Sequence, residues 1–142
     1  MTFINADLIA AGLAPLQPAS AALKAMRLMA AMMHECAEQS RDFAIETTLA
    51  GRTYIGLIRD WKVRGYTVHI IFLRLPDSDT AINCVAQRVR LGGHHVPEDI
   101  VRRRFAQGWR IFCDIYRGLA DTWDVYDSSG PEPVLIDEGT AS

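Results

Sequence analysis

The chain has 142 residues, the length of one ordinary domain, and its 49% hydrophobic and 23% charged residues are typical of a globular protein with its own core. A net charge of −2 gives no overall field that would attract nucleic acid or an anionic membrane. The three cysteines are far apart and odd in number, which favours reduced thiols in a cytoplasmic protein over a disulfide framework. No apolar run approaches the roughly 18 residues that a membrane span requires.

The predicted elements alternate between strands and helices along the whole chain. In chain order they are a strand at 3–5, a helix at 19–39, a strand at 42–48, a helix at 52–64, a strand at 66–75, a helix at 79–91, a long helix from 97 past 116 with a break expected at Gly108, and strands at 123–126 and 134–136. This order predicts an α/β fold with a mostly parallel sheet and helices on both faces. Without a repeat or a linker, residues 1–142 are predicted to form a single domain.

Residue patterns also predict which faces are buried and where elements end. One face of the helix at 19–39 is expected to pack in the core, because apolar residues recur there at steps of three and four: Leu23, Met26, Ala30, Met33 and Ala37. The apolar centre of the strand at 66–75 predicts that helices cover both of its faces. Asp77 and Ser78 are expected to cap the following helix, and Gly65 and Gly92 to end helices.

Ligands of such sheets bind at the carboxyl ends of the strands, so the residues after each strand are the candidates for chemistry. They are Asn5 and Asp7 after the first strand, Glu46, Thr47 and Thr48 after the second, and Arg74 and Asp77 after the third. A carboxylate at this position is able to take a proton from a hydroxyl while a second holds substrate hydroxyls. From spacing alone, Asp7 and Glu46 are better explained as loop and cap residues.

A second group of candidates surrounds a predicted junction between two helices. It reads Arg88-x-Arg90-x-Gly92-Gly93-His94-His95-x-Pro97 and is followed by Arg102-Arg103-Arg104. Glycines give mobility and arginines bind phosphate oxygens, as a lid over a nucleotide requires, although a solvated helix face explains the arginines equally well. Adjacent histidines rarely point the same way, so no metal site is expected here. The net charge and the lack of an aromatic platform argue against nucleic-acid binding.

One phosphate-binding motif is missing from the printed sequence. A P-loop, GxxxxGK(S/T), needs a lysine followed by serine or threonine. The only lysines are Lys24, which precedes alanine, and Lys62, which precedes valine. The printed chain is therefore not expected to bind ATP phosphates as P-loop kinases do.

Three segments and the tail together resemble the zeta-toxin family of P-loop kinases. They are Phe3–Ala10 (FINADLIA), Phe43–Arg52 (FAIETTLAGR), Arg88–Asp99 (RVRLGGHHVPED) with Arg102–Phe105, and Tyr126–Gly130 (YDSSG). The resemblance covers essentially the whole chain in the right order, but begins at the family's second strand. It therefore implies a P-loop kinase-like fold without its first βα unit, in an N-terminally incomplete domain.

The resemblance also implies an activity and roles for single residues. Enzymes of this family use ATP and Mg²⁺ to phosphorylate a hydroxyl of a small substrate, and UDP-N-acetylglucosamine is the type of substrate known for toxins. By position, Asp7 resembles the general base. Asn5, Glu46, Thr48 and Arg52 resemble substrate-binding positions, and Arg88, Arg90 and Arg104 resemble lid residues that contact the ATP phosphates.

Three hypotheses account for a chain that carries these residues without a P-loop. The first is a fragment, or a misassigned start, of an active kinase. The second is a non-catalytic derivative that binds a nucleotide sugar or a partner protein such as an antitoxin. The third is an assembly module whose open sheet edges pair with another chain, including a second copy. A sheet that lacks a central strand leaves backbone groups without hydrogen bonds, at about 1–3 kcal/mol each.

Overall fold

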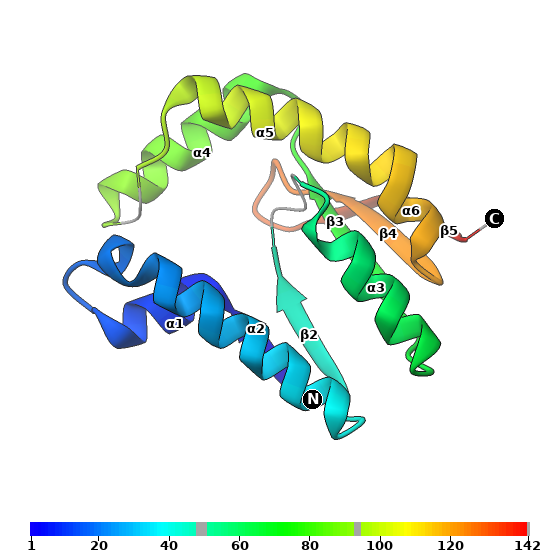
Figure 1. Ribbon diagram of the computed structural model, residues 1–142. Coiled ribbons are helices and arrows are strands. Elements are labelled where there is room, and N and C mark those ends of the chain that lie inside the picture. Colours follow the sequence, from blue (N-terminus) through cyan, green and yellow to red (C-terminus); the bar gives the residue numbers. More distant parts are fainter. Residues whose placement is uncertain (48–50, 93–94, 142) are drawn as a thin grey trace. The chain divides into compact units, whose positions relative to one another are not determined.

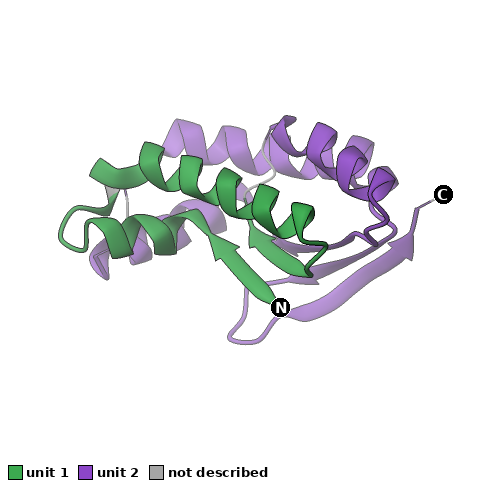
Figure 2. Ribbon diagram, turned by 60° about the horizontal axis from the view of Figure 1, so that its bottom comes forward, with its two compact units in different colours: residues 1–47 green, residues 48–142 purple. Residues whose placement is uncertain are grey.

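A computed structural model describes residues 1–47, 51–92 and 95–141 of the chain (Figure 1). The chain divides into two compact units, residues 1–47 and 48–142, which Figure 2 shows in green and purple. Each unit contains helices and a sheet with one parallel strand pair, so the mixed α/β class predicted from the sequence is confirmed. The single domain over residues 1–142 stays a prediction.

The first unit is a short parallel sheet with two helices. Its elements are β1 (Thr2–Asn5), α1 (Ala6–Leu13), the 3-10 turn η1 (Pro18–Ala21), α2 (Ala22–Glu38) and β2 (Phe43–Glu46). Strands β1 and β2 pair in parallel from Thr2↔Phe43 to Asn5↔Glu46, so both strands end at the same edge. Helix α1 was not predicted from the sequence, because eight residues give little more than two turns of periodicity.

The predicted buried face of α2 is partly wrong. Met33 and Ala37 are buried as expected, but Leu23 and Met26 are each 62% exposed and Ala30 is exposed as well. The buried stripe at this end of α2 centres on Ala25, which forms a core cluster with Ala10 and Ala21 and packs against Ile9 and Ala14. Small side chains at this contact allow α1 and α2 to approach closely, which turns Leu23 and Met26 outward.

The second unit contains the larger sheet and the longer helices. Its elements are α3 (Thr53–Val63), β3 (His69–Arg74), α4 (Ser78–Arg90), α5 (Glu98–Ile111), the π-helical turn η2 (Phe112–Tyr116), α6 (Arg117–Leu119), β4 (Thr122–Asp127) and β5 (Val134–Thr140). The strand order is β3-β4-β5. Strand β3 is parallel to β4, and β5 is antiparallel with a bulge beside Val125. Gly65 and Gly92 directly follow the C-cap residues of α3 and α4 and have φ values of 97° and 89°, as predicted for residues that end helices.

Aromatic side chains form the core between α5, η2 and the sheet. Phe112 stacks on Phe72 with ring centroids 4.7 Å apart and meets Trp123 edge to face at 6.0 Å. Phe112 and Tyr116 are completely buried. The expected break at Gly108 is wrong, since Gly108 is buried within α5 and the irregular turn comes at η2 instead.

The opposite side of β3 is open. Ile71 and Leu73 are each 59% exposed, whereas Ile70 and Phe72 between them are partly buried. The expectation that both faces of this strand are covered is therefore wrong for these two residues. An unbroken apolar run does not reveal which of its alternate side chains face helices.

Candidate functional site

The ends of β1 and β2 carry the best-defined polar contact in the first unit. Asn5 and Glu46 are the last residues of their strands and lie opposite each other in the register. The Asn5 Nδ2 group donates a hydrogen bond of 2.7 Å to Glu46 Oε2. Because both side chains sit at the carboxyl edge of a parallel pair, the structure brings together the two strand ends from which the sequence predicted a substrate site.

Asn5 also fixes the start of α1. Its Oδ1 atom accepts hydrogen bonds from the backbone N–H groups of Asp7 at 2.8 Å and Leu8 at 3.2 Å, which makes Asn5 the N-cap. Both ends of the amide are thus engaged, one by the helix and the other by Glu46. Because Asn5 is itself held in place by the helix, its hydrogen bond fixes the orientation of the Glu46 carboxylate.

Asp7 occupies the first turn of α1 and is exposed. The helix N-terminus favours a negative charge at this position. Across the described ranges, its carboxylate makes no hydrogen bond or ion pair. An exposed carboxylate without internal partners is available to accept a proton from a bound hydroxyl.

Two predicted substrate-binding residues lie outside the first unit, and the structure does not place them relative to this group. Thr48 lies outside the described residues. Arg52 belongs to the second unit, where it directly precedes α3, is exposed and makes no capping hydrogen bond with its side chain. Roles for both residues stay predictions.

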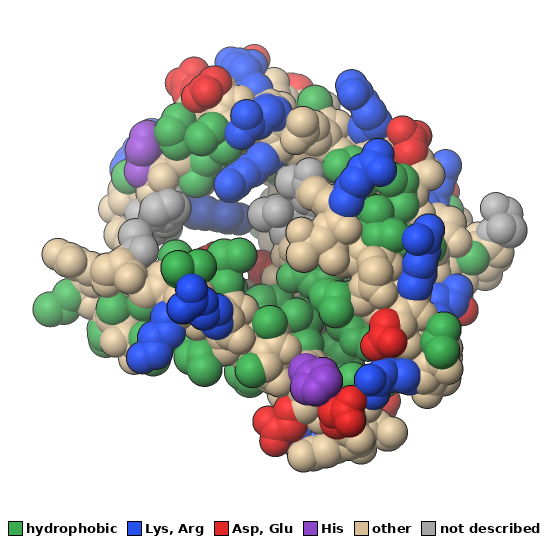
Figure 3. Space-filling view, viewed as in Figure 1, with side chains coloured by type: hydrophobic (Ala, Val, Ile, Leu, Met, Phe, Trp, Pro, Cys, Tyr) green, Lys and Arg blue, Asp and Glu red, His purple; other side chains and the backbone are tan. Residues whose placement is uncertain are grey.

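The predicted lid arginines lie on the two helices that follow β3. Arg88 and Arg90 are in the last turn of α4, and Arg104 is on α5; all three are exposed. Figure 3 shows basic side chains over this helical pair, mixed with acidic ones. His94, between the two helices, lies outside the described residues. Exposed guanidinium groups of this kind are free to bind phosphate oxygens.

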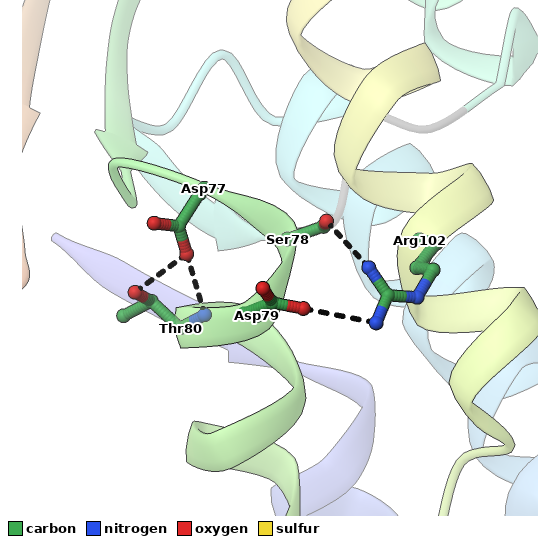
Figure 4. A network of polar contacts seen from close by, with 5 residues as sticks. All are labelled: Asp77, Ser78, Asp79, Thr80 and Arg102. Atoms are coloured by element: carbon green, nitrogen blue, oxygen red, sulfur yellow. Dashed lines mark hydrogen bonds and ion pairs between the residues drawn. The ribbon is translucent and has the colours of Figure 1, made fainter.

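Arg102, which the sequence placed beside these arginines, has a different environment (Figure 4). Its guanidinium donates to Ser78 Oγ at 3.0 Å and to Asp79 Oδ1 at 2.9 Å, so α5 is tied to the first turn of α4. Asp77 caps the same turn through Thr80 N at 2.7 Å and Thr80 Oγ1 at 2.8 Å, as predicted. These two hydrogen bonds hold the pKa of Asp77 below its ordinary value.

The carboxyl end of β3 holds a contact that sequence reasoning missed. The guanidinium carbon of Arg74 lies 3.8 Å from the centroid of the Trp109 ring, a cation–π geometry. The Arg74 carbonyl accepts a hydrogen bond of 2.9 Å from the backbone of Ser128, which follows β4. Trp109 is 35 positions from Arg74 in the sequence, so no local pattern pointed to the pair.

Among residues 1–47, 51–92 and 95–141, no three His, Cys, Asp or Glu side chains are grouped as a metal site requires. None of the helices in these ranges has the length and apolar character needed to cross a membrane.

A comparison of the sequence with models of protein families shows the family of this chain. The sequence model of the family described as Zeta toxin matches residues 17–138. The chain belongs to the zeta toxin family. The match includes Glu46 and the lid arginines, whereas Asn5 and Asp7 precede it. Family membership and the mixed α/β structure agree with the predicted P-loop kinase-like fold class.

One curated relative has a sequence of similar extent. It is an uncharacterized protein of Haemophilus influenzae, 30% identical over 102 residues, which are 72% of this chain and 73% of that protein. No solved structure matches the chain.

Proposed function

We propose that this chain binds a small, hydroxyl-bearing substrate of the nucleotide-sugar class, such as a UDP-N-acetyl amino sugar, at the carboxyl ends of β1 and β2 for phosphoryl transfer from ATP. The observation that carries the proposal is the hydrogen bond between Asn5 and Glu46, next to the exposed Asp7. Membership of the zeta toxin family supports a kinase-type reaction.

Each residue of this edge has a chemical task in the proposal. Glu46 accepts hydrogen bonds from substrate hydroxyls, while Asn5 holds one of its oxygens and thereby orients the carboxylate. Asp7 takes the proton of the hydroxyl that attacks the γ-phosphorus, so that the bond to the leaving ADP breaks as the new P–O bond forms. Because phosphoryl transfer depends mainly on positioning, a preset carboxylate is a suitable part of such a site.

The nucleotide side of the proposal rests on the arginines of α4 and α5. Arg88, Arg90 and Arg104 would bind phosphate oxygens of ATP, whose charge Mg²⁺ shares in reactions of this type. The printed sequence contains no GxxxxGK(S/T) segment, which is where P-loop kinases hold those phosphates. Binding of the hydroxyl-bearing substrate is therefore the part of the proposal that this chain tests directly.

Titration calorimetry of the 142-residue chain with UDP-N-acetylglucosamine tests the acceptor site. We expect Glu46→Gln to weaken binding by about tenfold or more, because hydrogen bonds to a charged group contribute about 1.5–3 kcal/mol. Asp7→Asn should bind nearly as well as the wild type, since a general base acts on the transferred proton. Glu132→Gln, on the exposed loop before β5, is the matched control. Equal affinities of the wild type and Glu46→Gln, or no binding, would contradict the proposal.

A second candidate is a protein of the same fold that binds the sugar nucleotide without catalysis, because the Glu46 carboxylate held by Asn5 needs no ATP to accept hydrogen bonds from hydroxyls. Both candidates predict sugar-nucleotide binding at Glu46, but they differ in the product. Mass spectrometry after incubation with ATP, Mg²⁺ and the sugar nucleotide distinguishes them. A phosphorylated product that disappears in Asp7→Asn supports catalysis, whereas binding that is independent of ATP and yields no product supports the second candidate. An antitoxin partner stays a prediction from the family.

A further inference from the structure

Arg74 is one of two half-buried arginines in the chain, whereas the other arginines are exposed. The second is Arg117, and both lie over tryptophan rings. The guanidinium carbon of Arg74 is 3.8 Å from the ring centroid of Trp109, and that of Arg117 is 5.4 Å from the centroid of Trp123. The two pairs differ in place, because Arg74 is the last residue of β3 whereas Arg117 precedes β4. Only the Arg74 pair therefore lies at the carboxyl edge of the parallel strands.

Trp109 is a rigid support for the Arg74 side chain. Its ring meets Phe72 edge to face with centroids 5.4 Å apart, and it lies 5.9 Å from Phe112, which is completely buried. Phe72 and Arg74 are two residues apart on β3, so both point to the side of the sheet that contacts α5. The Arg74 backbone is held as well, since its carbonyl accepts a hydrogen bond of 2.9 Å from the Ser128 N–H group. These contacts position the guanidinium without using its N–H groups.

The described part of the chain supplies no counter-ion for this guanidinium. No carboxylate of residues 1–47, 51–92 and 95–141 lies within ion-pair distance of Arg74. Asp127 is opposite Arg74 in the register of β3 and β4, but its Oδ1 atom accepts a hydrogen bond of 2.8 Å from the Ser129 N–H group instead. A cation–π contact engages the face of the guanidinium and leaves its in-plane N–H donors for another partner. Because Arg74 is partly removed from water, an oxyanion would be attracted more strongly here than at an exposed arginine.

We propose that Arg74, supported by Trp109, binds a phosphate group at the carboxyl end of β3 and β4. This edge of a parallel sheet is where ligands bind, and the planar fork of a guanidinium matches two phosphate oxygens. The exposed Ser129, two residues after the end of β4, adds a hydroxyl donor at the same edge. A phosphate has more charge and more acceptor oxygens than a carboxylate, so it uses such donors more fully. The ligand class is a phosphate or diphosphate, either as a free ion or as part of a nucleotide.

Titration calorimetry of the 142-residue chain with pyrophosphate tests this site. Arg74→Gln removes the charge and the fork, and should weaken binding at least about tenfold. Arg74→Lys keeps the charge over the ring but lacks the fork, and should weaken binding at least about threefold. Arg117→Gln changes the net charge equally at the other half-buried arginine, so it is the matched control and should bind as the wild type does. Circular dichroism checks that each variant is folded, and Arg74→Lys decides if Arg74→Gln is not.

Tryptophan fluorescence locates the ligand beside Trp109. Pyrophosphate should change the emission of the wild type, because the bound anion alters the charge over this ring. Trp109→Phe keeps an aromatic face for Arg74, so it should bind pyrophosphate within about threefold of the wild type while the emission change is lost. Sodium acetate at the same ionic strength should cause no such change in the wild type.

Competition with pyrophosphate identifies the source of the phosphate group. Displacement by ATP assigns the site to a nucleoside triphosphate, displacement by UDP-N-acetylglucosamine assigns it to the diphosphate of a sugar nucleotide, and displacement by inorganic phosphate alone assigns it to the free ion.

Four results would overturn the proposal. They are no binding of pyrophosphate, unchanged affinity in the folded Arg74 variants, an equal loss of affinity in Arg117→Gln, and an emission change that acetate reproduces. Pyrophosphate has no sugar hydroxyl, so none of these results depends on the substrate site at Glu46.

Discussion

Different substitutions of Asn5 separate its contribution to the stability of the chain from its contribution to the proposed binding site. Its Oδ1 atom caps α1 and its Nδ2 atom holds Glu46, so different substitutions remove different contacts. Asn5→Ser keeps an oxygen that is able to cap the helix but lacks the donor to Glu46. Asn5→Ala loses both contacts. Asn5→Asp keeps the cap and sets a second carboxylate against Glu46.

The expected magnitudes follow from the two contacts. Loss of an N-cap costs about 1 kcal/mol, and the exposed hydrogen bond to Glu46 contributes at most about 1 kcal/mol to the free energy of unfolding. Asn5→Ala should therefore destabilise the chain by about 1–2 kcal/mol, whereas Asn5→Ser should cost less than about 1 kcal/mol. Asn5→Asp should be less stable than Asn5→Ser at neutral pH, because two adjacent carboxylates repel each other.

Urea unfolding followed by circular dichroism measures these differences, and calorimetry with UDP-N-acetylglucosamine measures binding. Asn5→Ser should weaken binding while nearly preserving stability, because the orientation of the Glu46 carboxylate is lost. If Asn5→Ser and Asn5→Ala are equally unstable, the capping role is refuted. If Asn5→Ser binds the sugar nucleotide as the wild type does, the orientation of Glu46 by Asn5 is unimportant for the site.

Four further substitutions test the packing, a helical glycine, a buried hydrogen bond and a helix cap. Gly139→Ala should destabilise the chain by about 1–3 kcal/mol in urea unfolding, because the added Cβ would lie 2.6 Å from Cζ2 of Trp123. Gly12→Ala, which adds a Cβ in open space on α1, should stabilise the chain by about 0.5–1 kcal/mol. Tyr116→Phe should cost about 1 kcal/mol, since the hydroxyl donates a 2.7 Å hydrogen bond to a backbone carbonyl. Burial raises the pKa of the Tyr116 hydroxyl above 10.0. The stability that the neutral hydroxyl contributes is therefore present below pH 10 and is lost as the pH rises further. Melting curves of Tyr116→Phe should lack this loss. Because the pKa of Asp77 is lowered, its pH dependence runs the other way. The stability that the ionised carboxylate contributes is present above the ordinary pKa of 3.8 and is lost as the pH falls below it. Acid titration of Asp77→Asn should lack that loss.

Much of the element order was predictable from the sequence because its signals are local. Asp77 caps the helix that begins beside it, and Gly65 ends the helix that precedes it, through contacts within a few residues. Strand ends were placed well enough to select Asn5 and Glu46 as neighbours at one edge. Helix α1 was not predicted, because so short a helix depends on packing against α2.

Local sequence patterns are sufficient to predict the alternation of strands and helices, the family resemblance and the polar residues at the strand ends. The tertiary structure alone decided which side of each element is buried. Ala25, not Leu23, faces α1, and Ile71 remains exposed on β3 although its run of neighbours is apolar. It also decided that Arg102 binds Asp79. Helical and strand periods fix which residues share a face, but only contacts between distant segments select the face that leaves water.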